Sequence, residues 1–173
     1  MSTAHPLFPA SLVPPDAASS LDASFTLRPL DRGDYARGFL DCLAGLTWMG
    51  DVSQAQWDER FDDMNTGGNG PYYYLVIELA GRIVATGAVI AEKKFIQNRA
   101  VVGHIEEICV AEDHRGKGLG LVMVRALDSL ARKVGCSKNI LNCGPKNEAF
   151  YIRCGYTRSG IEMRHDLAGG ADS

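Results

Sequence analysis

Long apolar stretches, an excess of positive charge and paired cysteine motifs are all missing from this 173-residue chain. No apolar run approaches the roughly 20 residues that a membrane-spanning helix needs, so we expect no membrane partner. The net charge of -3 and the isoelectric point near 5.8 give no reason to expect nucleic acid, and an anionic ligand would need a local basic patch. Residues 1–20 lack a basic stretch followed by an apolar one, so we expect no secretory signal there.

The five cysteines fit no metal or redox motif. Their number is odd, none belongs to a C-x-x-C pair, and no zinc-binding spacing with histidine occurs, so we expect no metal. Free thiols in a reducing compartment are the simplest interpretation. The cytoplasm is therefore the expected location by default, with an organelle left open.

The composition, 46% apolar and 23% charged, is ordinary for a globular domain. We expect one domain over residues 25–167. Residues 1–24 are rich in Pro, Ala and Ser, and they and residues 168–173 are predicted to be flexible tails.

The predicted elements mix strands and helices. Alternating apolar residues predict strands at 25–30, 72–79, 82–91, 104–110, 138–143 and 160–165. Helical spacing and caps predict helices after Asp31 (to Leu46), after the capping box of Ser53 and Gln56, at 118–134, and at 147–154 with Asn147 as its cap. The three strands from 72 to 110 follow one another closely, as in an antiparallel meander. The order predicts a mixed α/β fold whose mostly antiparallel sheet is flanked by helices.

The segment Arg115-Gly116-Lys117-Gly118-Leu119-Gly120 joins a predicted strand to the longest predicted helix. Its three glycines let the backbone curl so that successive N–H groups face one concavity, and the helix adds the positive end of its dipole. Such a site suits a phosphate or pyrophosphate. The segment lacks the Lys-Ser/Thr pair of a P-loop and the spacing of a dinucleotide-binding loop, and a flexible turn is the alternative.

The strand before this segment carries two adjacent acids, Glu106 and Glu107. Strict alternation divides its residues between two faces, with Ile105, Glu107 and Cys109 on one and Glu106, Ile108 and Val110 on the other. In a central strand each carboxylate costs free energy unless it is paired or functional. The alternative is a strand with solvated ends and both acids exposed.

These features resemble two nested families. The R-x-x-G-x-G pattern is similar to the pyrophosphate loop of the Gcn5-related N-acetyltransferase superfamily. Nearly everything from residue 25 to the last predicted strand resembles the glucosamine 6-phosphate N-acetyltransferases of eukaryotes. The stretches that carry this second resemblance are Leu46-Thr47-x-x-Gly50, Lys93-Lys94-Phe95-Ile96, Gly103-His104-Ile105-Glu106-Glu107-Ile108, and Asn147-x-x-Phe150-Tyr151-x-x-x-Gly155-Tyr156.

The resemblance implies a splayed strand pair that admits acetyl-CoA as co-substrate. Residues implied to hold it are the backbone of Ile108, Cys109 and Val110, the loop from Arg115 to Gly120, and Asn147, Phe150, Tyr151 and Arg153. The Val110 N–H would stabilise the thioester oxyanion, and Tyr151 would protonate the departing thiolate. Packing beside Phe150 is the alternative role for Tyr151.

The family pattern also implies an acceptor site for an amino sugar phosphate, made by Thr47, Lys94, Phe95, Ile96, Gln97, Glu106, Glu107 and Asn142. Lys94 has a reason of its own, since a dianionic phosphate needs cations that the overall charge does not supply. A solvated loop is the alternative for Lys94, and a helix terminus is the alternative for Thr47.

Two positions depart from the family. Asn142 stands where the family carries an acid, and an amide cannot take a proton. The amine would then lose its proton to water ordered by Glu106 or Glu107, or along a backbone carbonyl path. Asp166 stands where a phosphate-binding arginine falls, and we expect Arg164 to replace that arginine.

The implied reaction is acetyl transfer to the amine of glucosamine 6-phosphate by direct attack in a ternary complex. Only Cys109 and Cys143 lie near enough to act as nucleophiles, and we expect neither to form an acetyl-enzyme. The family also implies a homodimer whose C-terminal strands reach towards the partner's site. The alternatives are acetylation of another amine (protein, polyamine or aminoglycoside) and a non-catalytic acyl-CoA sensor.

Overall fold

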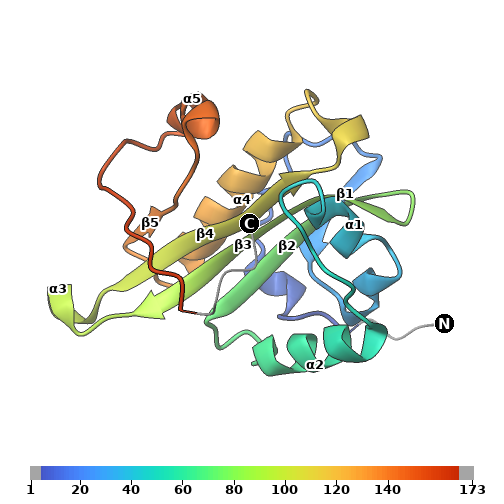
Figure 1. The fold of residues 1–173 in the computed structure, drawn as a ribbon, viewed down its shortest axis with the longest axis horizontal. Coiled ribbons are helices and arrows are strands. Elements are labelled where there is room, and N and C mark those ends of the chain that lie inside the picture. The colour runs from blue at the N-terminus through green and yellow to red at the C-terminus, as the bar shows by residue number, and fades with distance from the viewer. Residues whose placement is uncertain (1–4, 168–173) are drawn as a thin grey trace.

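A five-stranded sheet forms the centre of the computed structural model, which describes residues 5–167. The strands lie side by side in chain order, as β1 (Phe25–Pro29), β2 (Tyr72–Leu79), β3 (Arg82–Lys93), β4 (Val101–Val110) and β5 (Lys138–Ile140). The first three pairings are antiparallel and the β4–β5 pairing is parallel, which confirms the predicted mixed, mostly antiparallel sheet (Figure 1).

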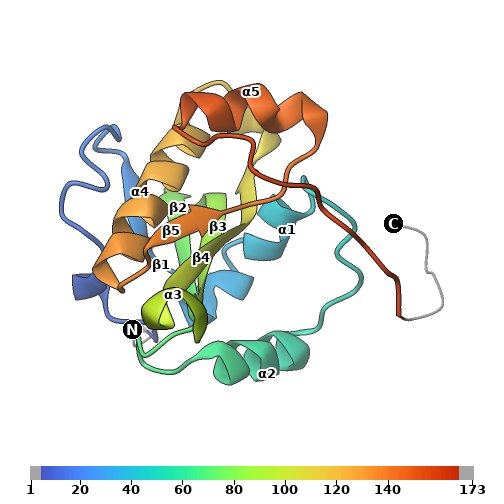
Figure 2. The same cartoon turned by 90° about the vertical axis from the view of Figure 1, so that its left-hand side faces the viewer.

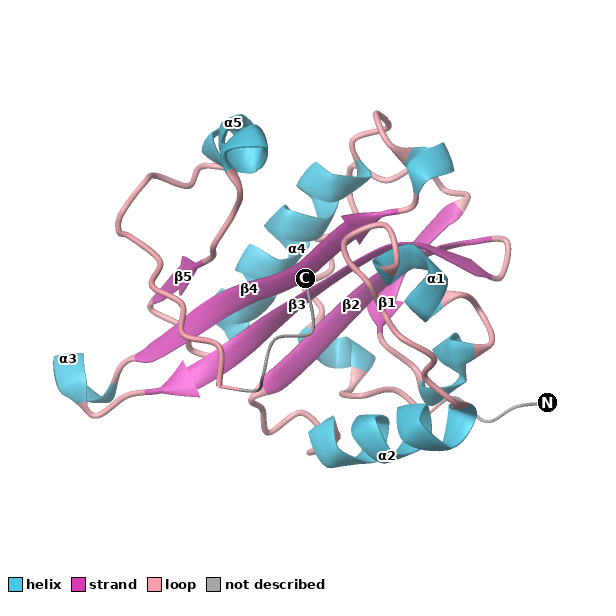
Figure 3. Ribbon diagram, viewed as in Figure 1, coloured by secondary structure: helices cyan, strands magenta, loops and turns pink. Residues whose placement is uncertain are grey.

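Helices cover both faces of this sheet. The helix α4 (Leu119–Lys133) lies on one face, and α1 (Phe39–Leu43) and α2 (Gln54–Met64) lie on the other (Figure 2). The short α3 (Ile96–Arg99) caps the β3–β4 hairpin, and α5 (Pro145–Arg153) follows β5 (Figure 3). Within residues 5–167, no helix is long and apolar enough to cross a membrane.

Close packing fixes α4 on the sheet. Its apolar stripe is buried, and Met123 and Leu127 have no exposed surface. A methyl group on Gly87 of β3 would lie within 3 Å of both side chains, so the glycine lets helix and strand approach closely. The segment before α4 therefore starts from a rigid support.

Most predicted strands and helices are confirmed, but the helix predicted after Asp31 is wrong in part. It divides into a 3-10 turn (Arg32–Tyr35) and α1, because Gly38 between them adopts a left-handed φ of 82°. Leu46, predicted to lie on the buried face of that helix, follows α1 and is 51% exposed. The Ser53 capping box is present, and α2 begins at Gln54 as its pattern indicates.

Residues 5–24 do not form the free tail predicted from their composition. Leu7 and Phe8 are each 1% exposed, and the Leu7 N–H donates to the Leu30 carbonyl. The Phe8 ring packs edge-on against Tyr73, with 5.3 Å between ring centroids. Two apolar residues buried this completely outweigh the prolines and alanines around them. Residues 1–4 and 168–173, predicted to be flexible, lie outside the described residues.

The C-terminal elements also differ from their prediction. The strand predicted at 138–143 ends at Ile140, and α5 begins at Pro145 after Gly144 instead of at an Asn147 cap. No strand forms at 160–165, where Ile161 and Met163 are each 89% exposed. Alternation marks a segment able to pair, but pairing also needs a free strand edge alongside.

Candidate active site

The strands β4 and β5 pair at one end only. Val102–His104 pair with Lys138–Ile140, which we call the closed end. Residues 105–110 of β4, the open end, have no strand partner on this side within the described chain. Figure 1 shows the short β5 beside one end of β4, from which the chain leads away to α5. The predicted splayed strand pair is therefore confirmed.

A β-bulge interrupts β4 within the open end. Glu107 has a left-handed φ of 53°, and the register leaves Glu107 and Ile108 opposite the single residue Gly87. The Thr86 hydroxyl donates to the Glu107 carbonyl at 3.0 Å and so ties the bulge to β3. The strict alternation predicted for this strand is therefore wrong at Glu107, because the extra residue breaks the period of two. Both acids, Glu106 and Glu107, are exposed.

The Glu107 carboxylate reaches solvent but has protein around it. Loss of water raises its pKa, and the negative charge of Glu106 raises it further, while the Tyr74 hydroxyl and the positive charge of Arg60 act in the opposite direction. The raised pKa brings Glu107 closer to what a general base needs. Sequence reasoning missed Tyr74, since nothing in the run Tyr72-Tyr73-Tyr74 distinguishes it.

Tyr151 of α5 lies close enough to Glu106 to feel the charge of that carboxylate. Its ring packs against Phe150 and Tyr156, with centroid distances of 5.0 and 6.1 Å. Burial raises the pKa of Tyr151 to about 12, with smaller contributions from Cys143, Cys154 and the charge of Glu106. Its hydroxyl is therefore protonated at neutral pH and able to donate.

The glycine loop after β4 has left-handed backbone at two positions. Gly116 and Gly118 adopt φ values of 78° and 81°, and a methyl group on either would meet no atom within 4 Å. The first helical hydrogen bond of α4 runs from the Val122 N–H to the Gly118 carbonyl, at 3.1 Å. The N–H groups before Val122 therefore have no carbonyl partner within the helix. Such open space beside N–H groups fits a pyrophosphate.

The loop and α5 come close at Gly120. A methyl group built there would lie 3.3 Å from the Phe150 ring and 3.7 Å from Val110. The glycine therefore lets the helix that carries Tyr151 pack near the start of α4.

Arg115 is placed differently from its predicted role. Its Nε donates to the Val110 carbonyl at 3.2 Å, and its Nη2 donates to the Gly45 carbonyl at 3.5 Å. The guanidinium therefore holds the end of β4 to the chain after α1. Lys117 and Arg153 are exposed cations without an ion pair in the described residues, and the Leu119 side chain is buried.

Cys109 presents its side chain to α1. It is 5% exposed, and its Sγ donates to the Cys42 carbonyl at 3.0 Å. The Cys42 thiol beside it lowers the pKa of Cys109, burial raises it, and the positive charge of Arg115 lowers it further. Its thiol is thus engaged in the core, while Cys143 is exposed in the loop before α5.

The predicted acceptor residues 94–97 lie at the other end of β4. A ten-residue strand spans roughly 30 Å, so they are about that far from the glycine loop (Figure 1). Lys94 Nζ forms an ion pair with Glu92 at 2.5 Å, and Glu92 also contacts His104 at 2.7 Å. Phe95 and Ile96 are 99% and 68% exposed, and Gln97 has a left-handed φ of 49°. One chain does not bring these residues to Tyr151.

The remaining predicted site residues are all exposed. Thr47 lies between α1 and α2, Asn142 follows β5, and Asn147 is in the first turn of α5. Arg164 forms an ion pair with Asp166 at 2.6 Å, so its charge is compensated. In residues 5–167, no group of three or more His, Cys, Asp or Glu side chains could hold a metal ion.

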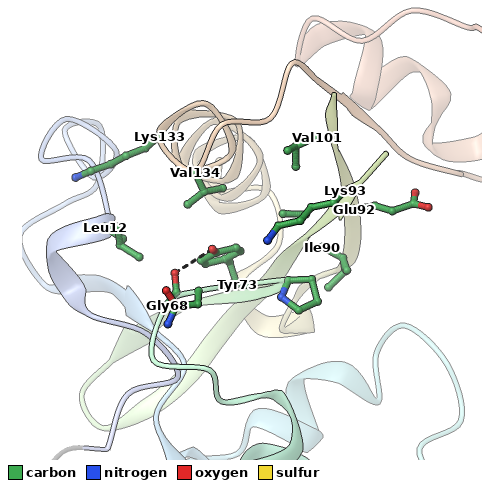
Figure 4. Close-up of a pocket in the computed structure, with 13 residues that line it drawn as sticks. Leu12, Gly68, Tyr73, Ile90, Glu92, Lys93, Val101, Lys133 and Val134 are labelled. Carbon is green, nitrogen blue, oxygen red and sulfur yellow. Dashed lines mark hydrogen bonds between the residues drawn. The ribbon is translucent and has the colours of Figure 1, made fainter. Parts of the chain in front are cut away.

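A separate cavity of about 650 Å³ lies by the C-terminal end of α4 (Figure 4). Leu12, Tyr73, Ile90 and Val134 give it apolar walls, and the Tyr73 hydroxyl donates to the Gly68 carbonyl at 3.1 Å. None of the predicted site residues lines it, so the candidate active site is the open end of β4.

Comparisons with known proteins agree with this geometry. The acetyltransferase (GNAT) family matches residues 40–156. A glucosamine 6-phosphate N-acetyltransferase of Candida albicans is 37% identical over 143 residues, covering 83% of this chain and 96% of its own. One of Arabidopsis thaliana is 37% identical over 141 residues, covering 81% and 95%. The crystal structure of the Arabidopsis enzyme superposes with a TM-score of 0.79, over 83% of this chain and 98% of that one.

Proposed function

Because the chain belongs to the glucosamine 6-phosphate N-acetyltransferases of the acetyltransferase (GNAT) family, we propose that it acetylates the amine of D-glucosamine 6-phosphate with acetyl-CoA. The products are N-acetyl-D-glucosamine 6-phosphate and CoA. The observation that carries the proposal is the open end of β4, followed by a glycine loop with open surroundings at Gly116 and Gly118. Tyr151, whose pKa burial raises to about 12, is the proposed acid.

Acetyl-CoA supplies an acetyl group already activated as a thioester. The N–H groups of residues 116–120 would hold its pyrophosphate, and the exposed cations Lys117 and Arg153 would add positive charge. The backbone of Ile108, Cys109 and Val110, which has no strand partner on the β5 side, would bind the pantetheine arm as an added strand. Asn147 and Phe150 of α5 would line the opposite side.

The side chains at the open end supply proton transfers. Tyr151 keeps its proton until a thiolate departs and then donates it. The Val110 N–H would stabilise the oxyanion. Glu107, whose pKa is raised, and Glu106 would accept the amine proton directly or through water, while Asn142 orients the amine by hydrogen bonding. The amine attacks directly, in keeping with a Cys109 thiol that is engaged in the core.

The acceptor phosphate requires residues that lie away from Tyr151 in one chain. We propose a homodimer in which the exposed segment 160–165, with Arg164, reaches the partner's site, and residues 94–97 contribute to phosphate binding. Support comes from apolar side chains left open to solvent, Phe95 at 99% and Ile161 and Met163 at 89% each. Sedimentation at micromolar concentration tests this assembly; a monomer there would contradict it.

Release of CoA, followed with a thiol reagent, tests the reaction. The purified chain receives acetyl-CoA with glucosamine 6-phosphate, unphosphorylated glucosamine, a polyamine or an aminoglycoside. Fast release with the phosphorylated sugar alone supports the proposal. Release with another amine only would replace the acceptor, and acetyl-CoA binding without any release would indicate a sensor.

A further inference from the structure

A polar cluster joins three elements behind the closed end of the strand pair. Asp128 of α4 accepts two hydrogen bonds on its Oδ1, one from the Asn139 Nδ2 of β5 and one from the Tyr156 hydroxyl after α5, each at 2.6 Å. We call these three residues the Asp128 network. Asn139 and Tyr156 lie 11 and 28 residues after Asp128 in the chain, so the network forms only in the folded protein.

The place of Asn139 is unusual for its residue type. Asparagine is depleted in strands, and its Oδ1 is buried without a partner in the described residues. A methyl group on Gly103, its partner on β4, would overlap this oxygen. Burying the polar side chain of Asn139 costs free energy, and the hydrogen bond from its amide to Asp128 offsets that cost. The contact fixes the edge strand β5 to α4.

The Tyr156 contact extends the network to the helix that carries Tyr151. Gly155 has a left-handed φ of 97°, and the Tyr156 N–H donates to the Tyr151 carbonyl at 3.0 Å, which closes α5 in a Schellman motif. The Tyr156 ring also packs against the Tyr151 ring. The position of Tyr151 therefore depends on Tyr156, whose hydroxyl donates a hydrogen bond to Asp128.

The rest of α5 has few other anchors. None of its residues is buried; Phe150 lies against Gly120, and the Glu148 carboxylate accepts two hydrogen bonds from Arg158 in the chain after the helix, at 2.9 and 2.8 Å. Burial of Tyr156 raises its pKa, and the bond to Asp128 raises it further, so the hydroxyl stays a donor. A helix held at so few points is oriented by each of them.

We infer that Asp128 is a positioning residue for acetyl transfer: by binding Asn139 and Tyr156 it sets Tyr151 relative to the open end of β4. This inference rests on the proposed function, since the Tyr151 hydroxyl is the group whose place matters. Asp128 itself touches no reacting atom. Its removal changes the geometry of proton donation and leaves the glycine loop in place.

Three variants test the inference. In Asp128→Ala, kcat is expected to fall about tenfold because Tyr151 is displaced, while KM for acetyl-CoA stays within about twofold. Asp128→Asn keeps an oxygen that accepts both bonds and is expected to retain at least about half of the wild-type kcat. Ser129→Ala, the next position of α4, is the matched control, since its hydroxyl makes no hydrogen bond among the described residues.

A double-mutant cycle adds a decisive readout. Tyr156→Phe removes the same connection, so the Asp128→Ala and Tyr156→Phe losses in kcat are expected to be non-additive. Losses that multiply, or an Asp128→Asn variant as slow as Asp128→Ala, would overturn the inference.

Hydrogen exchange separates this inference from the proposed function. Without ligand, the amides of residues 146–153 are expected to exchange faster in Asp128→Ala than in wild type, while those in the middle of α4 do not change. If wild type turns over no glucosamine 6-phosphate, the proposed function fails, and the exchange of α5 still decides what Asp128 holds. Unchanged exchange and unchanged kcat in Asp128→Ala would refute the positioning role.

Discussion

The two ends of β4 are built in opposite ways. At the closed end, three residues pair with β5 and the Asp128 network fastens that strand to α4. At the open end the strand is bulged, keeps two exposed carboxylates and has no strand on the β5 side within the described chain. Strand pairing satisfies backbone groups internally, so the unpaired end is left able to bind a ligand's polar groups. The closed end is thus fixed by pairing and side-chain hydrogen bonds, while the open end keeps backbone groups and carboxylates available.

The largest expected effect is at the open end. Tyr151→Phe removes the proposed acid without changing packing much, and kcat is expected to fall about 10²-fold. Because the pKa of Tyr151 is about 12, wild-type kcat should show no loss of this acid up to about pH 11. CoA release measured across pH checks both statements. Tyr72→Phe serves as the control, and a Tyr151→Phe enzyme within twofold of wild type would contradict the assignment.

The closed end should respond in stability. Gly103→Ala places a methyl group on the Asn139 oxygen, and overpacking of this kind costs about 2 kcal/mol. Urea unfolding measures the loss. In the double variant Gly103→Ala with Asn139→Ala the overlap with Asn139 is removed and only the contact with Val89, at 2.9 Å, remains, so the cost is expected to be below the sum of the single costs. Strict additivity would mean that the two residues do not meet.

A smaller effect is expected in the glycine loop. Gly118→Ala forces a left-handed φ of 81° on alanine at a cost of about 1–2 kcal/mol, and Kd for acetyl-CoA is expected to rise about tenfold. Gly144→Ala is the matched control, since Gly144 caps α5 with an ordinary φ of -68° and equally open surroundings. Calorimetric titration gives both constants; equal affinity in the two variants would place the pyrophosphate elsewhere.

The smallest expected effect is at Glu107, where one substitution is expected to raise the stability of the protein and lower its turnover. Its pKa is raised in the folded state, so folding favours the protonated form and stability falls as pH rises through that pKa. Glu107→Gln is therefore expected to melt roughly 1–3 °C higher at pH 7.5, with the gain vanishing near pH 4, while turnover falls. Thermal unfolding at the two pH values checks this, and a variant less stable at pH 7.5 would contradict it.

Local features of the molecule were predicted from the sequence, and features that depend on a neighbouring strand were not. The glycines of residues 116–120, the apolar stripe of α4 and the boundaries of β2 are local patterns, and the structure has them as expected. The bulge at Glu107 was missed, because an extra residue in one strand shows only against the register of its neighbour. The roles proposed for Tyr151, Lys94 and Asn142 stay predictions.

The errors have one physical cause. Leu7 and Phe8 looked like part of a tail, and residues 160–165 looked like a strand, because composition and alternation describe what a segment can do by itself. Whether two apolar residues are buried, or an alternating segment pairs as a strand, depends on residues that are distant in the sequence.

The sequence by itself determined most of the order of elements, the glycine-rich turn and the family, since backbone freedom at glycine and the periods of helix and strand are short-range properties. Only the tertiary structure decided where β4 and β5 part and which groups meet there. It brought Asp128 to Asn139 and Tyr156, and Tyr74 to Glu107. These contacts depend on strand register and side-chain packing, which are fixed only when segments distant in the sequence pack against one another.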